Sequence, residues 1–213
     1  MPATSTSKAA SKLRRGQAWK QGRRKELLDA GDRTISRLGA AASMDDVAAE
    51  ARVSRVVLYR YFGDKGGLYQ ALAERYLGRL MKHLQRALAS TDDPRPRVEA
   101  TIDAYVRFIE KNRMAYDFLM QRAIREGPGA HATVTDFMNT VAEEVHHILD
   151  AELSRLGLDA SPAGSWARAL VGMVHLSTDW WLEQPGIPRR RLVQELLDLL
   201  SRGLFAAPMP RTR

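Results

Sequence analysis

Residues 51–65, with the sequence ARVSRVVLYRYFGDK, place four basic side chains and two tyrosines among regularly spaced aliphatic residues. An arginine can donate two hydrogen bonds to O6 and N7 of guanine, an aliphatic side chain can contact the methyl group of thymine, and a tyrosine can donate to a phosphate. The segment therefore has the chemistry needed to read base pairs in the major groove of DNA. The alternative is a structural helix whose basic residues are incidental.

A helical arrangement of this segment separates its side chains by type, at 100° per residue. Leu58 and Phe62 fall on one face, which we expect to point inward. Val56 and Arg60 fall on the opposite face, and Tyr59 lies at its edge. A face that only meets water typically carries Glu, Lys and Gln rather than valine and tyrosine. The pattern therefore favours a binding face.

Two short helices joined by a turn are predicted around this segment. Ser43 followed by Asp46 resembles a capping box at the start of the first helix. A turn follows at Arg52, and Ser54 is expected to cap the second helix. Asp64 is placed to cap a third, longer helix. Two short helices separated by a turn of about three or four residues match a helix-turn-helix.

The excess positive charge lies at the N-terminus. The net charge is +8, and residues 1–25 hold eight of the 33 lysines and arginines and no acidic residue. Residues 1–19 are rich in Ser, Thr, Ala, Lys and Arg, so we expect a flexible arm before a helical period that begins near Arg23. Such an arm either adds salt-dependent affinity for a polyanion or serves as a solubilising tail.

The rest of the chain predicts helices and no strand. An apolar helical period runs from residue 65 to residue 88 and stops before two prolines. Glycine- and proline-rich breaks separate the further helical segments expected at about 96–112, 113–126, 131–157, 162–184 and 189–205. We therefore predict an all-α fold of about nine helices. With no cysteine, no secretory signal and no run of roughly 18 apolar residues, a cytoplasmic protein without a membrane partner is expected.

Residues 43–68, SMDDVAAEARVSRVVLYRYFGDKGGL, resemble the DNA-binding domain of the TetR family of bacterial transcriptional regulators. The resemblance rests on the capped helix, the V-S-R turn, the LYRYF segment and the Asp-Lys pair that follows. It implies a basic arm at 1–19, a helix-turn-helix domain at 20–66 and a helical ligand-binding and dimerisation domain at 67–207. It also implies that DNA is contacted by Lys20, Arg23, Arg24, Ser43, Arg55, Val56, Val57, Tyr59, Arg60, Tyr61 and Lys65.

Two departures from the family pattern have physical consequences. Arg52 stands in the turn where the family usually has glycine, so we expect a positive φ there at a cost on the order of 1 kcal/mol. Val56 and Val57 stand where Gly and Thr are frequent. Two valines remove a hydroxyl and add methyl surface, which favours thymine in the operator.

The last two expected helices carry apolar stripes that are wide for single-sided packing. Examples are the leucines between Leu192 and Leu200 and the Trp180-Trp181 pair. The resemblance implies that these helices join two subunits in a four-helix homodimer interface. A two-fold dimer would present two recognition helices about 34 Å apart, one for each half of a palindromic operator. The alternative is that they are core helices of a monomer.

Bulky and flexible side chains gather in the expected C-terminal helices. Taken one at a time they are explained as core residues, but together they could line an adaptable pocket for a small apolar or amphipathic ligand, such as an acyl compound or a hydrophobic drug. Arg122 or Arg125 could neutralise a carboxylate on such a ligand. The candidate ligand-binding residues are Tyr105, Phe108, Tyr116, Phe118, Met120, Phe137, Met138 and Met173.

No catalytic or cofactor motif is found. The sequence lacks a nucleophile elbow, a Walker A loop, a dinucleotide fingerprint and an H-E-x-x-H zinc motif, so we predict neither an enzyme nor a cofactor. His146 and Asp150 share a helical face without a third ligand, so no metal site is predicted, and His175 is expected to be a satisfied core histidine. The function expected is a repressor that binds a palindromic operator and is released by its effector. The alternatives are an activator and a ligand-independent architectural DNA-binding protein.

Overall fold

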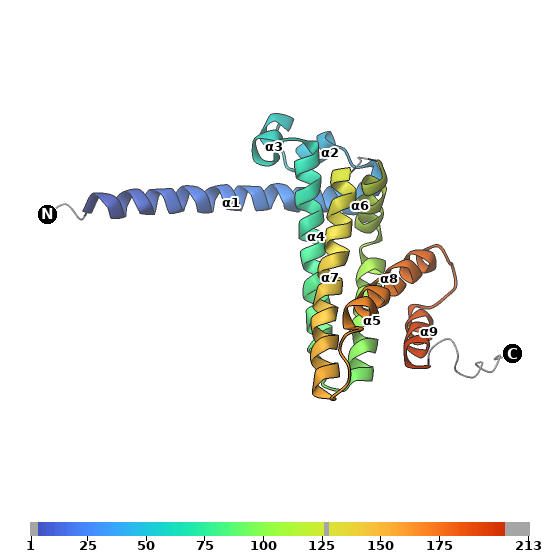
Figure 1. Cartoon of the computed structure of the whole chain (residues 1–213). Helices are drawn as coiled ribbons and strands as arrows, with labels where there is room; N and C mark the ends of the chain where they lie inside the picture. The colour runs from blue at the N-terminus through green and yellow to red at the C-terminus, as the bar shows by residue number, and fades with distance from the viewer. Residues whose placement is uncertain (1–3, 126–127, 203–213) are drawn as a thin grey trace. The chain divides into compact units, whose positions relative to one another are not determined.

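The computed structural model describes the backbone of residues 4–125 and 128–202, and the side chains of residues 16–120, 135–136 and 138–202. Within these residues the chain forms nine α-helices, one short 3-10 helix (Gly39–Ala41) and no strand, which confirms the all-α prediction. The helices, labelled in Figure 1, are α1 (Thr4–Leu38), α2 (Met44–Glu50), α3 (Arg55–Phe62), α4 (Lys65–Leu88), α5 (Pro94–Lys111), α6 (Arg113–Arg125), α7 (Pro128–Arg155), α8 (Ala163–Leu182) and α9 (Arg189–Arg202).

Helix α1 begins at Thr4, well before the start near Arg23 that apolar periodicity predicts. Residues 4–22 contain two glycines and no proline, and most of the others are Ala, Lys, Arg, Gln, Ser and Thr. Several of these residue types have high helix propensity, so the helix can continue past the part that packs on a core. The flexible arm at residues 1–19 and the domain limits at 19 and 66 stay predictions.

The described residues fall into two compact units. The first unit contains residues 1–76 and 114–133, and the second unit contains residues 77–113 and 134–213. Helix α6 after its first residue therefore folds with the N-terminal helices, although it follows α5 of the second unit in the sequence.

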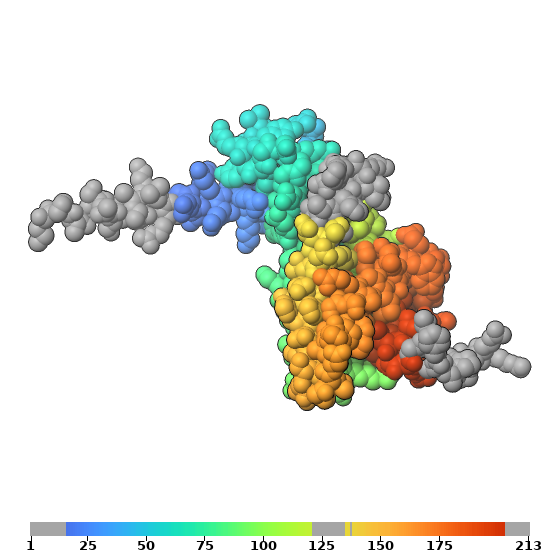
Figure 2. All heavy atoms as spheres, viewed as in Figure 1, coloured from blue at the N-terminus to red at the C-terminus, as the bar shows by residue number. Residues whose placement is uncertain are grey.

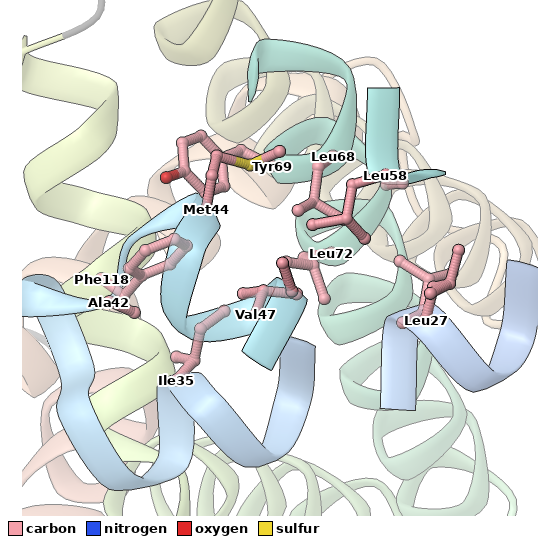
Figure 3. Packing of buried hydrophobic residues seen from close by; sticks show 13 residues of the cluster. Leu27, Ile35, Ala42, Met44, Val47, Leu58, Leu68, Tyr69, Leu72 and Phe118 are labelled. Atoms are coloured by element: carbon pink, nitrogen blue, oxygen red, sulfur yellow. The ribbon is translucent and has the colours of Figure 1, made fainter. Parts of the chain in front are cut away.

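The core of the first unit joins α1, α2, α3, α4 and α6 (Figure 3). Phe118 of α6 is fully buried, and its ring lies edge-on to Tyr69 of α4 with a centroid separation of 5.3 Å. Leu58, the inward residue of α3, is also fully buried. The cluster consists of Leu27, Leu28, Ile35, Ala42, Met44, Val47, Ala48, Leu58, Leu68, Tyr69, Ala71, Leu72 and Phe118. This packing fixes α2 and α3 on a framework of longer helices.

In the second unit, helix α9 packs chiefly against α5. One side of α9 buries Leu192, Val193, Leu196 and Leu197, which confirms that part of its wide apolar stripe points inward. At the start of α9, Arg189 Nε donates to Asp103 of α5 at 2.9 Å and also pairs with Glu110. Among the described residues, no helix is both long enough and apolar enough to cross a bilayer.

Candidate nucleic-acid interface

The first helix of the predicted helix-turn-helix begins with the expected capping box. The Ser43 hydroxyl accepts from the Asp46 amide at 3.2 Å, and the Asp46 carboxylate accepts from the Ser43 amide at 2.9 Å. The Ser43 hydroxyl also donates to the Asp46 carboxylate, and the hydrogen bonds that this carboxylate accepts from the Ser43 hydroxyl and amide lower its pKa below the usual value. The box fixes where α2 starts and therefore where α3 follows it.

The turn between α2 and α3 has the predicted strained residue. Arg52 has a φ of 53°, and it is the only non-glycine residue with a positive φ among those described. The Val53 amide then donates to the Ala48 carbonyl at 3.0 Å, which closes the end of α2. The turn thus forms without glycine, at the cost on the order of 1 kcal/mol expected for an L-residue in this region.

The two caps predicted around α3 have different outcomes. Asp64 caps α4 as expected, because its carboxylate accepts from the Gly67 amide at 2.7 Å. Ser54 occupies the N-cap position of α3, as predicted. Its side chain makes no capping hydrogen bond, so the prediction that Ser54 caps the helix is wrong. The Ser54 side chain is exposed, and water can solvate the first amides of α3 in its place.

Helix α3 presents the outward face that the helical wheel predicts. Figure 2 shows α3, in cyan, at the surface of the first unit. Val56 is 68% exposed, Arg60 is exposed, and Val57, Tyr59 and Tyr61 are half-buried at its edges. An exposed valine beside an arginine and tyrosines gives this surface methyl groups and hydrogen-bond donors together, which is the combination that base edges require.

Basic side chains flank this surface. Lys65, at the first residue of α4, is exposed and lies 5.4 Å from the centre of the Tyr69 ring. The guanidinium of Arg24 lies 5.1 Å from the centre of the Phe62 ring at the end of α3. Lys20 is exposed, and Arg23 is half-buried and paired with Glu26 at 2.5 Å. The side chains of the more distal basic residues, Lys8 to Arg15, lie outside the described residues.

One member of this surface was missed by sequence reasoning. Asp45, in the first turn of α2, lies 3.3 Å from the guanidinium of Arg55 at the start of α3. The same guanidinium donates to the Tyr59 hydroxyl at 3.2 Å. The Tyr59 hydrogen bond and the nearby Asp45 carboxylate raise the pKa of Arg55 above its usual value. No local signal pairs residues ten positions apart across a turn, because the turn geometry decides the contact.

The second unit contains a separate apolar cavity of about 150 Å³. Thirteen of its lining residues are aliphatic or methionine: Leu84, Leu88, Val98, Ile102, Met138, Val141, Val145, Ile148, Leu149, Leu170, Val171, Val174 and Leu200. The other three are Arg97, Thr101 and Tyr105. The α5 and α7 members recur at spacings of three and four residues, a signal that a search for bulky side chains does not detect.

The predicted ligand-binding residues divide between several places. Tyr105 and Met138 line the cavity, whereas Phe108 is buried beside the His83 ring and does not. Met173 is half-buried on α8, about 100° around the helix from the cavity residue Val174. Tyr116, Phe118 and Met120 belong to the first unit, because α6 packs there. The side chains of Phe137, Arg122 and Arg125 lie outside the described residues.

The two histidines His175 and His146 both have partners in the structure. His175 has a hydrogen-bond partner as predicted, since its Nδ1 lies 2.9 Å from the Tyr105 hydroxyl, but it is half-buried rather than fully inside the core. Burial lowers its pKa below the usual histidine value, with Asp179 acting in the opposite direction. His146 interacts with Glu143 at 3.3 Å, and no group of three potential metal ligands occurs among the described residues.

One face of α8 exposes large apolar side chains. Trp166, Leu176 and Trp180 are 50%, 66% and 54% exposed. At 100° per residue these three positions fall within an arc of about 80°. Leu199 of α9 is 37% exposed. At its Trp166 edge, about 40° from Leu170, the face adjoins the cavity-lining positions of α8.

Two family models match this chain, one in its N-terminal part and one in its C-terminal part. Residues 27–72 match the family described as bacterial regulatory proteins, tetR family, and residues 83–211 match the tetracyclin repressor-like C-terminal domain. An uncharacterized HTH-type transcriptional regulator of Mycobacterium tuberculosis is 31% identical over 92% of this chain and 81% of its own length. The HTH-type transcriptional activator FasR of Mycolicibacterium smegmatis is 29% identical over 87% of this chain and 84% of its own length.

Solved structures share the fold. A TetR-like transcriptional regulator from Rhodococcus sp. RHA1 is 26% identical with a TM-score of 0.63, covering 85% of this chain and 95% of that one. The regulator FadR from Bacillus subtilis, solved in complex with stearoyl-CoA, has a TM-score of 0.65 at 16% identity, covering 84% of this chain and 98% of that one.

Proposed function

The chain belongs to the TetR family of bacterial regulatory proteins, and from that premise we propose that it is a repressor that binds a palindromic operator as a homodimer and is released by a small effector. Members of this family are DNA-binding transcription factors and not enzymes. The observation that carries the proposal is the outward face of α3, where Val56 and Arg60 are exposed beside Tyr59 and Tyr61. An operator on the chromosome would place the protein in the bacterial cytoplasm.

The second candidate is an activator. It is favoured by one observation, that the relative FasR is named an activator. The contacts of α3 with DNA would be the same in either case, because activation and repression differ in where the operator lies relative to the promoter. A reporter gene under the native promoter, compared with and without the protein, separates the two.

The experiment that tests DNA recognition is a selection of bound sequences from a random duplex pool at physiological salt. The expected result is a palindrome whose half-sites are one helical turn apart, because a two-fold dimer presents its recognition helices about 34 Å apart. Recovery of no motif, with binding that disappears as salt rises, would mean that the basic N-terminal segment alone holds DNA. The assignment of α3 as a recognition helix would then be wrong.

Arg60→Ala and Lys65→Ala should weaken DNA binding in different ways. Arg60 projects from the middle of the exposed face of α3, so its loss should cost about 1–3 kcal/mol at particular base pairs and relax specificity there. Lys65 stands at the N-terminus of α4, where a phosphate is favoured by the first helical amides, so its loss should weaken binding to all sequences and reduce the salt slope by about one.

The measurement for this pair is a set of binding titrations on the selected operator and on single base-pair variants of it, at several salt concentrations. Equal loss of affinity across all operator variants in both mutants would contradict the assignment of Arg60 to base reading.

The effector site that we propose is the cavity of the second unit. Its three polar lining residues already have hydrogen-bond partners in the protein. Arg97 Nε donates to the Thr91 carbonyl at 2.9 Å, and the Thr101 hydroxyl donates to the Arg97 carbonyl at 2.7 Å. The Tyr105 hydroxyl lies 2.9 Å from His175. Apart from the other N–H groups of Arg97, a polar effector group would meet hydroxyls that are already bonded, whereas a hydrocarbon group can contact the thirteen apolar lining residues. The part of the effector inside the cavity is therefore apolar.

Helix α4 is the route that we propose from this cavity to DNA. It begins with Lys65, a proposed phosphate contact, and ends with the cavity residues Leu84 and Leu88. An effector can shift the balance between two conformations only by its different affinity for each of them. We propose that the effector favours a conformation in which α4 has pivoted, so that the two recognition helices of the dimer no longer match the groove spacing.

Toluene should bind this cavity, and benzoate of similar size should not. An apolar cavity of about 150 Å³ can hold a ring of benzene size. Benzoate would bury a charge beside one cationic lining residue, Arg97, which already donates to the Thr91 carbonyl and lies 3.6 Å from Asp92. At ten times its Kd, toluene should raise stability by about 1.4 kcal/mol, which corresponds to roughly 3–6 °C in Tm. The measurement is thermal unfolding with each compound.

Val174→Phe, which places a ring in the cavity, should abolish the toluene shift. Leu158→Phe adds the same ring on an exposed residue and should leave the shift unchanged. A larger shift with benzoate than with toluene would contradict the apolar assignment.

A further inference from the structure

The guanidinium of Arg55, the first residue of α3, is held from two sides. Its Nε lies 3.3 Å from Asp45 Oδ1, and its Nη1 donates to Asp45 Oδ2 at 3.3 Å. On the other side its Nη2 donates to the Tyr59 hydroxyl at 3.2 Å. Asp45 comes from α2 and Tyr59 from the next turn of α3, so both short helices of the helix-turn-helix fix this one side chain.

The contacts leave a defined part of the arginine for another partner. A guanidinium carries five N–H donors in a planar fork. One N–H of Nη1 is bonded to Asp45 and one N–H of Nη2 is bonded to Tyr59, so one N–H remains on each terminal nitrogen. The side chains of Arg55 and Asp45 are 51% and 69% exposed, so this remaining edge is accessible to a macromolecule. An arginine can donate two hydrogen bonds from its guanidinium to the O6 and N7 acceptors of guanine.

We propose that Asp45 is a positioning residue for base recognition: it holds Arg55 so that the two remaining donors meet a guanine in the major groove. The proposal rests on the proposed function, since it requires α3 to lie in the groove. Asp45 itself need not contact DNA. An arginine without this support would sample several rotamers and could equally well contact a phosphate, which carries no sequence information.

The negative charge of Asp45 distinguishes a positioning role from a purely structural one. A carboxylate close to the DNA backbone repels phosphates and lowers affinity for every sequence. Its removal should therefore raise non-specific affinity while it lowers discrimination at one base pair. A residue that only supported the fold would lower both. The ion pair is exposed and contributes little to stability, and the capping box of α2 uses Ser43 and Asp46, so the variant should fold.

The test compares the full-length protein with Asp45→Asn, Arg55→Ala and the double variant, in titrations on the operator and its single base-pair variants. Arg55→Ala identifies the base pair that Arg55 reads. Asp45→Asn should lose roughly tenfold of the discrimination at that same base pair, within the range of about 5- to 150-fold that one bidentate contact supplies. Its affinity for random DNA should rise by about twofold or more. In the Arg55→Ala background, Asp45→Asn should cause no further loss of discrimination.

Glu74→Gln is the matched control, because it removes one negative charge from an exposed residue of α4 that is bonded to Gln70 and not to Arg55. It should leave discrimination at the Arg55 base pair unchanged. Asp45→Glu should retain part of the discrimination that Asp45→Asn loses, since it keeps the carboxylate.

Two results would overturn the proposal. One is an Asp45→Asn protein with the same base preference as the wild type. The other is a variant that loses affinity equally for all sequences. Failure of the proposed function itself has a different signature, because the wild-type protein would then show no base preference at any position.

Discussion

The double variant Leu176→Glu, Trp180→Glu should be a monomer whose operator affinity is lower by about 10²- to 10⁴-fold. Leu176 and Trp180 lie one turn apart on α8 and are 66% and 54% exposed. Large apolar side chains gathered on one face mark an interaction site, and the single-sided core packing of α8 gives them no role inside the subunit. We propose that they meet the same residues of a second copy across a two-fold axis, because symmetric contacts of this kind are the commonest route to a dimer.

The expected loss of affinity comes from the link between two half-sites. In a dimer, binding of the first recognition helix makes the second event intramolecular, with an effective concentration in the millimolar range. Two glutamates on each subunit would place four carboxylates in the interface without partners, which opposes association. The monomer would keep the contacts of one α3 and lose the gain from the second, which amounts to about 10²- to 10⁴-fold.

The measurements are the mass in solution by light scattering and the affinity for the selected palindrome and for a single half-site. Leu156→Glu, Leu158→Glu is the control, because these exposed leucines follow α7 and are not on the α8 face. The control should stay dimeric. A Leu176→Glu, Trp180→Glu protein that remained a dimer would show that another surface joins the subunits. Affinity for a half-site should be the same in all the variants.

The elements of the candidate DNA interface could be predicted from the sequence because their signals are local. The Ser43–Asp46 capping box, the Asp64 cap and the positive φ of Arg52 each depend on a few consecutive residues. The inward position of Leu58 follows from the period of a single helix. Local hydrogen bonds and helical geometry are largely the same in any tertiary context, so a short window of sequence contains the information.

What the sequence did not predict depends on contacts between distant segments. The position of Asp45 beside Arg55 requires the geometry of the turn, and the cap expected from Ser54 depends on a hydroxyl orientation that the structure does not adopt. Helix α1 starts at Thr4 because residues of high helix propensity extend it beyond the part that packs on the core. Hydrophobic periodicity does not take helix propensity into account.

The residues that line the cavity also depend on contacts between distant segments, and the sequence did not predict most of them. Counting bulky residues selected Phe118 and Tyr116 as ligand contacts because they follow α5 in the sequence. The structure places α6 in the first unit, where both are buried. The cavity is instead built from smaller aliphatic residues such as Val141 and Val174. A cavity forms where side chains fail to fill the space between helices, so residue size alone is a misleading guide.

Phe118→Ala should lower the free energy of unfolding of the first unit by about 3–5 kcal/mol, the cost of deleting a fully buried aromatic ring. Phe118 has no exposed surface, and the edge-on contact with Tyr69 adds to the apolar area that it buries. Because this core also contains Leu58 of α3, the loss should loosen the helix-turn-helix and weaken operator binding.

The measurement is denaturant unfolding followed by operator titration. Phe118→Leu, which keeps much of the apolar volume, should cost markedly less than alanine, and Met120→Ala on the half-buried side of α6 should cost less again. A loss below about 1 kcal/mol for Phe118→Ala would mean that α6 is not part of this core.

Toluene binding distinguishes the two roles considered for Phe118. If Phe118 is a core residue of the first unit, Phe118→Ala should leave the affinity of the cavity for toluene unchanged, measured at a temperature where the variant is folded. If Phe118 is a ligand contact, Phe118→Ala should weaken toluene binding and have a smaller effect on the free energy of unfolding. The structure favours the first outcome, because the cavity is lined by residues of α4, α5, α7, α8 and α9, and Phe118 is enclosed by α1, α2 and α4 of its own unit.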